Sequence, residues 1–172
     1  MSRNLKRIER GEDSGLLGEV IRATVVCEDG GCGYIVEEVF NCLEEGGKIE
    51  GGPPEPRSAQ ETLESIATKY GAKNIRARGA FTGVYMSCDE VIDELNAMKI
   101  GGHAIVRTEV AGEEFGHVAN IIKDRKGIAR ELDFQNGLDV FRKTLNENFS
   151  NYLDRNRGKL AEGAYGFLTL KD

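Results

Sequence analysis

Two residues, His117 and Asp133, have the types and the spacing that a nucleophilic catalytic triad requires. His117 begins an apolar, strand-like run, and Asp133 ends a second such run that covers 128–133, with a short polar turn between the two. A hairpin of this kind places an imidazole beside a carboxylate, which can orient the ring while the ring acts as a base. We expect the nucleophile to be Cys32, which stands where a helical pattern begins.

The position of Cys32 suits thiol chemistry. A thiol attacks a carbonyl only as thiolate, and its ordinary pKa of about 8.5 leaves a few per cent ionised at neutral pH. A helix N-terminus and a neighbouring imidazolium, here from His117, both lower that pKa. Gly31 and Gly33 leave room for substrate beside the sulfur, and the N–H of Cys32 can donate to the developing oxyanion. Gln135, on the same strand face as Asp133, is expected to position the substrate or to support the strand end.

Other assignments of these roles remain open. Cys27, at the end of a strand-like run, is an alternative nucleophile, and His103 is an alternative base, although no Asp-x-Gln element follows it. Cys42 falls inside a helical pattern and is expected to pack, while Cys88 follows a helix-capping serine. The four cysteines form no C-x-x-C pair and match no common zinc spacing, so we expect reduced thiols, no metal site and no cofactor.

The elements that must hold these residues can be read from periodicity and turn residues. Residues 1–16 are polar and basic, as in a tail, and 17–172 are expected to form one domain. Helical patterns are bounded by serine caps or glycines, and strand patterns by short turns. The expected order is strand 20–26, helix 32–45, loop 51–56, helix 58–70, helix 87–100, strands 103–110, 118–122 and 128–133, helix 138–149 and strand 165–170. Early helices and a late meander predict an α+β fold, with the nucleophile helix packed across an antiparallel sheet.

Composition narrows the class of partner. The chain has 172 residues, 40% of them hydrophobic and 30% charged, with a net charge of −6. This acidic balance argues against general binding to nucleic acid. No apolar stretch approaches the roughly 20 residues of a membrane-spanning helix, and the first 20 residues hold no signal-peptide core. We therefore expect neither a nucleic-acid nor a membrane partner.

The motifs themselves resemble a known family. The segments GHVANII (116–122) and LDFQNG (132–137) are similar to the His and Asp-x-Gln-x-Gly motifs of papain-fold polymorphic-toxin and effector domains. Gly31-Cys32, the apolar helix and the glycine turn at 46–47 resemble the family's nucleophile helix and the turn after it. The family consists of bacterial cysteine enzymes, among them protein glutamine deamidases.

The resemblance implies a papain-like fold and a reaction on a carboxamide, in which Cys32 attacks a glutamine side chain, ammonia leaves and the thioester is hydrolysed to glutamate. It also implies secretion or translocation by a dedicated system, a target protein in the cytoplasm of a host or competitor cell, and a cognate immunity or chaperone protein. A cysteine peptidase or a transglutaminase would use the same acyl-enzyme. A non-catalytic acidic binding or immunity module is the alternative from outside the enzymes.

Overall fold

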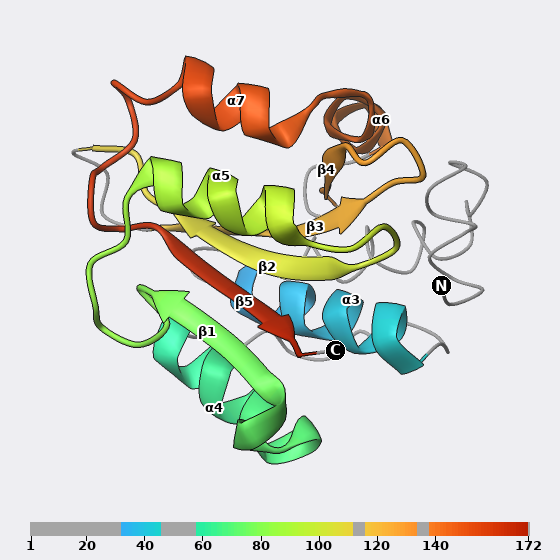
Figure 1. Cartoon of the computed structure of the whole chain (residues 1–172), viewed down its shortest axis with the longest axis vertical. Coiled ribbons are helices and arrows are strands. Elements are labelled where there is room, and N and C mark those ends of the chain that lie inside the picture. The colour runs from blue at the N-terminus through green and yellow to red at the C-terminus, as the bar shows by residue number, and fades with distance from the viewer. Residues whose placement is uncertain (1–31, 46–57, 112–115, 134–137, 172) are drawn as a thin grey trace.

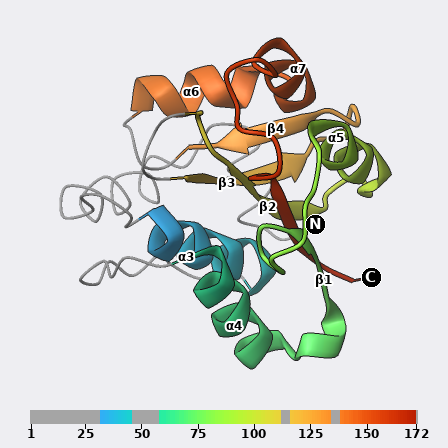
Figure 2. The ribbon, with the colours of Figure 1, turned by 90° about the vertical axis from the view of Figure 1, so that its left-hand side faces the viewer.

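The structure is a computed structural model that describes residues 32–45, 58–111, 116–133 and 138–171. A five-stranded antiparallel sheet in the order β1-β5-β2-β3-β4 separates two layers of helices (Figures 1 and 2). The elements are α3 (Cys32–Glu45), α4 (Ala59–Tyr70), the 3-10 helix η1 (Ala72–Asn74), β1 (Ile75–Gly79), α5 (Cys88–Ala97), β2 (His103–Thr108), β3 (His117–Lys123), β4 (Ala129–Leu132), α6 (Leu138–Asn146), α7 (Phe149–Arg155) and β5 (Gly166–Leu170).

Each face of the sheet has its own hydrophobic core. Helices α3 and α4 pack on one face, and α5 and α7 pack on the other, while α6 lies beside β4 (Figure 2). Successive side chains of a strand point to opposite faces, so neighbours in β2 and β3 belong to different cores. Ile105 and Val118 join the α3 side, whereas Val106 and Ala119 join the α5 side. The parity of a residue, that is, whether its number within a given strand is odd or even, therefore decides which helices its side chain contacts.

Local signals place the helix starts as the sequence predicts. The hydroxyl of Ser58 accepts from the N–H of Glu61, and that of Ser87 accepts from the N–H of Glu90. Both glutamate carboxylates in turn accept a hydrogen bond from the N–H of the capping serine, which completes two capping boxes. At the other end of α5, the ammonium of Lys123 donates to the carbonyls of the last turn.

The predicted hairpin is confirmed as β3 and β4, and the α+β class with α3 across an antiparallel sheet is also confirmed. Asp124 holds its turn by accepting from two backbone N–H groups, at 2.9 Å each. The first strand of the meander is shorter than predicted, since β2 ends at Thr108 and Val110 forms only an isolated bridge with Leu160.

Two element predictions are wrong. The single helix expected over 138–149 is two helices, because α6 ends at Asn146 and the side chain of Asn148 caps a separate α7. Strand β1 was missed, although its sequence IRARG alternates apolar and charged residues over a typical strand length. The predicted tail 1–16, strand 20–26, loop 51–56 and domain boundary at residue 17 lie outside the described residues.

Candidate active site

Helix α3 begins at Cys32, as predicted, and its first turns are fixed over β3. The buried side chain of Asn120 donates from Nδ2 to the backbone oxygen of Val36 at 3.0 Å. Val36 and Val118 also share the core on this face. The start of α3 therefore lies at the end of the sheet where β3 begins with His117.

His117 has a carboxylate partner. Its Nε2–H donates to Oε2 of Glu131 at 3.3 Å, and its side chain is 46% exposed. Partial desolvation lowers the pKa of His117, but the hydrogen bond to Glu131 and the charges of Glu131 and Asp133 outweigh it, so the pKa lies above its ordinary value. The site thus favours imidazolium, which is the form that stabilises a neighbouring thiolate.

Glu131 is the residue that sequence reasoning missed. Asp133 was predicted to orient His117, whereas the structure shows Glu131 on the ring nitrogen and gives the buried Asp133 an electrostatic contribution. The two carboxylates are two residues apart and so share a strand face. That alternation was available in the sequence and could have identified Glu131 as a second candidate.

Alternation also sets the direction of the His117 side chain. His117 has the parity of Ala119 and Ile121, which pack in the α5 and α7 core, whereas Val118 and Asn120 face α3. His117 therefore leaves the sheet on the face opposite α3. Cys32 and His117 lie at one end of the sheet, and a contact between them would run around that end.

Several predicted site residues are only partly described. Gly33 lies in the first turn of α3, and nothing of the Cys32 side chain is described. Gly31 and Gln135 lie outside the described residues, as does the alternative nucleophile Cys27.

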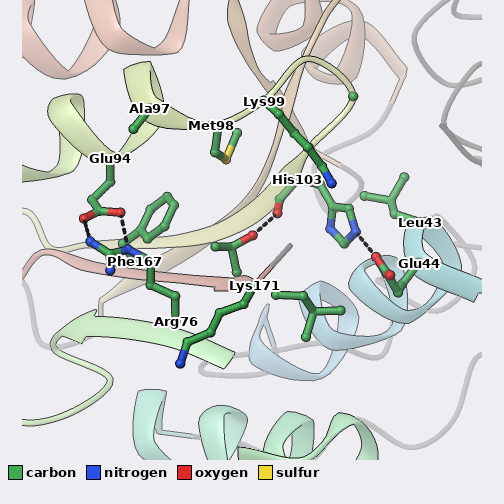
Figure 3. Close-up of a pocket in the computed structure, with 14 residues that line it drawn as sticks. Leu43, Glu44, Arg76, Glu94, Ala97, Met98, Lys99, His103, Phe167 and Lys171 are labelled. Atoms are coloured by element: carbon green, nitrogen blue, oxygen red, sulfur yellow. Dashed lines mark hydrogen bonds and ion pairs between the residues drawn. The ribbon is translucent and has the colours of Figure 1, made fainter. Parts of the chain in front are cut away.

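The alternative base, His103, also has a carboxylate partner. It is only 8% exposed, and its Nε2–H donates to Oε2 of Glu44 on α3 at 2.9 Å (Figure 3). That hydrogen bond is the main reason that the pKa of Glu44 lies below its ordinary value. The ring also meets Phe40 edge-on, with 4.7 Å between centroids. In the sequence, the acidic partner of His103 was sought on the following strand. The partner is instead Glu44, which comes earlier in the chain and lies on a helix.

Two cysteines are unsuited to nucleophilic attack. Cys42 and Cys88 are both buried. Burial also raises the pKa of the Cys88 thiol, so this thiol stays protonated at neutral pH. Neither Cys42 nor Cys88 is therefore placed for catalysis.

The described part of the chain has no metal-binding cluster and no membrane-spanning helix. No group of three or more His, Cys, Asp or Glu side chains is arranged there to hold a metal ion. None of the described helices has the length and apolar character needed to cross a bilayer.

Comparison with solved structures gives a weak likeness. No family model and no curated protein matches the sequence. The fold is similar to that of RavD (residues 1–200) from Legionella pneumophila (strain Corby), with 12% identity, a TM-score of 0.34, and coverage of 81% of this chain and 76% of that one. A likeness at this level does not establish a family.

Proposed function

We propose that this protein is a papain-like cysteine hydrolase that deamidates a glutamine side chain of a target protein. One observation carries the proposal: the Asn120–Val36 hydrogen bond holds the helix that begins at Cys32 at the end of the sheet where β3 begins with His117, around which the two side chains would have to meet. The imidazole at that position has a raised pKa, as a thiolate–imidazolium pair requires.

The chemistry follows from these two positions. The Cys32 thiolate, at the N-terminus of a 14-residue helix, attacks the carboxamide carbon. The N–H of Cys32 donates to the oxyanion, and imidazolium at His117 protonates the departing ammonia. Neutral His117 then removes a proton from water, which attacks the thioester and releases glutamate and the thiolate.

Glu131 on β4 and Asp133, just after that strand, have different roles in this proposal. Glu131 holds one ring nitrogen of His117, which leaves the other for the sulfur or the substrate. Asp133 adds negative charge that favours imidazolium. Gln135, Gly31 and Gly33 keep their predicted roles at the substrate, and the proposed partners are a target protein in another cell and a cognate immunity or chaperone protein.

The first test is the alkylation rate of each cysteine against pH, in the wild type and in His117→Gln. We expect Cys32 to react fastest between about pH 6 and 7 and to lose this advantage without His117. The buried Cys88 serves as an internal control, because its rate should be low and independent of His117. Fast alkylation of Cys27 would move the nucleophile and refute the role of Cys32, and four ordinary rates would refute the enzyme.

The second test identifies the reaction. Candidate host proteins are incubated with the wild type or with Cys32→Ala, digested and mapped by mass spectrometry. Conversion of Gln to Glu without new termini supports deamidation. New termini indicate a peptidase, and linkage of an added amine indicates a transglutaminase. Binding of a partner that is equal in the two proteins, with no covalent change, indicates the acidic binding module.

A further inference from the structure

One arginine, Arg107 of β2, points to the face of the sheet that α3 covers. It pairs in register with Val118 of β3. Opposite residues of an antiparallel pair, and residues two apart along one strand, point to the same face. Ile105 and Val118 both belong to the core under α3, so the Arg107 side chain leaves the sheet on the α3 side.

Helix α3 and strand β2 run in opposite directions (Figure 1). Glu44, near the end of α3, contacts His103 at the start of β2. The N-terminal end of α3 therefore lies toward the end of β2, which is where Arg107 stands.

The first turn of α3 lies at about the level of Arg107 along the sheet. Val36 is held over Asn120, whose register partner in β2 is Ile105. From Val36 back to Cys32, four residues of helix cover about 6 Å. From Ile105 on to Arg107, two residues of strand cover about 7 Å in the same direction. The helix start and the arginine therefore share one end of one face of the sheet.

The guanidinium of Arg107 is held in a fixed position. Its Nη1–H donates to the carbonyl oxygen of Ala164 at 2.9 Å, and its Nη2–H donates to Oε2 of Glu109 at 3.4 Å. Gly116, just before β3, leaves the space that the guanidinium occupies, because a Cβ at this position would lie 2.6 Å from Nη2. Any other residue at 116 would displace the guanidinium from the start of β3.

Much of the hydrogen-bonding capacity of this guanidinium is unused. An arginine side chain carries five N–H groups. Within the described residues Arg107 makes the two hydrogen bonds above, and its side chain is 22% exposed. The carboxylate of Glu109 is 3.4 Å away and 30% exposed, so it compensates the positive charge only in part. The remaining charge and N–H groups are available to a neighbouring anion.

We propose that Arg107 stabilises the Cys32 thiolate from the α3 side of the sheet, as a positioning residue for the nucleophile. This inference rests on the proposed function, because it concerns the same thiolate. A contact from His117 would run around the end of the sheet, whereas Arg107 stands on the face that α3 covers. An arginine also stays protonated over the whole range in which a thiol ionises, so its effect persists after the imidazolium has lost its proton.

The test is the alkylation rate of Cys32 with iodoacetamide, measured against pH by mass spectrometry in variants of Arg107. We expect Arg107→Gln to lower the rate about tenfold at about pH 6.5, because an opposite charge at close range changes the ionised fraction of an acid by about this factor or more. At about pH 9.5 the rate should approach that of the wild type, since the thiol ionises there without help. Arg107→Lys keeps the charge and should stay within about threefold of the wild-type rate at about pH 6.5. Arg142→Gln, at an exposed arginine of α6, is the matched control and should change neither rate.

A second variant keeps the test decisive if Arg107→Gln does not fold. Glu109 partly neutralises Arg107 and is 30% exposed, so its replacement should leave the fold intact. Glu109→Gln should raise the Cys32 rate about twofold at about pH 6.5, because it removes the competing carboxylate. An unchanged or lower rate in this variant would contradict the role of Arg107.

The outcomes separate this inference from the proposed function. Fast alkylation of Cys32 that needs His117 but not Arg107 would overturn the inference and leave the proposed function standing. An ordinary Cys32 rate in the wild type would overturn both. An equal loss of rate at both pH values in Arg107→Gln would indicate a change in the fold rather than in the thiolate, and it would also overturn the inference.

Discussion

Replacing Asn120 by Ala tests whether one buried hydrogen bond positions the nucleophile helix. Asn120 is 2% exposed, and its Nδ2 donates to the Val36 carbonyl at 3.0 Å. That carbonyl keeps its place in the α-helical ladder, so the loss is the net value of one hydrogen bond, about 1 kcal/mol. The void left by the carboxamide adds about another 1 kcal/mol. For a chain of this length, about 2 kcal/mol corresponds to a fall in Tm of about 4–8 °C.

The functional part of this prediction is that the alkylation rate of Cys32 falls in Asn120→Ala, at a temperature where the variant is folded. The matched control is Asn151→Ala, an exposed asparagine on α7, which should change Tm by no more than about 1–2 °C. An unchanged Cys32 rate in a destabilised Asn120→Ala would show that this bond supports the fold but not the site. An unchanged Tm would refute the assigned hydrogen bond itself.

The charged variant Asn120→Asp adds a pH signature. A buried carboxylate facing a carbonyl oxygen has a pKa raised above its unfolded value of about 3.9, because burial and repulsion disfavour the charge. Stability is then retained below the unfolded pKa and lost as the pH rises through the folded pKa. We expect Asn120→Asp to lose stability relative to Asn120→Ala between about pH 4 and 8, as measured by urea denaturation. Parallel curves for the two variants would contradict the burial of this position.

Four further predictions concern charges, hydrogen bonds and a helix cap. Glu131→Gln should lower the pKa of His117 in an NMR titration, because it removes the acceptor and the charge that raise it. In the wild type, the pKa of His117 is higher in the folded than in the unfolded state, where it is about 6.5, so charged His117 stabilises the fold fully below about pH 6.5. This contribution disappears as the pH rises through the folded-state pKa. The urea midpoints of wild type and His117→Gln should therefore converge at high pH. Lys123→Met should cost about 1–3 kcal/mol in urea denaturation, because the carbonyls of Leu95 and Asn96 at the end of α5 lose the hydrogen bonds from the Lys123 ammonium. Ser87→Ala should cost about 1 kcal/mol by the same measurement, through loss of the cap of α5.

Much of the fold was predictable because its signals are local. Capping boxes at Ser58 and Ser87 mark helix starts through contacts within one turn. The β3–β4 hairpin is marked by its polar turn and its apolar strands. The position of β5 between β1 and β2 has no such signal, since it depends on pairing between segments far apart in the chain. Strand β1 was missed for a similar reason, because the partners of its arginines are Glu90 and Glu94 of α5, which come later in the chain.

The candidate sites were predictable in type but not in pairing. The sequence indicated His117 and an acidic residue after it. Glu131 and Asp133 point to the same face of the sheet, and the one that is hydrogen-bonded to the His117 ring is Glu131. The partner of His103 is Glu44, and this pair exists only because α3 crosses the sheet with its C-terminal end over the start of β2. No spacing rule within a hairpin could have indicated it.

Strand parity separates the two histidines into two independent environments. His103 shares a face with Ile105 and meets α3, whereas His117 shares a face with Ala119 and lies on the α5 side. They also stand at opposite ends of the β2–β3 pair, because antiparallel pairing places the start of one strand beside the end of the other. The two imidazoles therefore do not share one environment. Helix α3 connects the two ends of the sheet, because its C-terminal Glu44 contacts His103 and its N-terminal residue is Cys32.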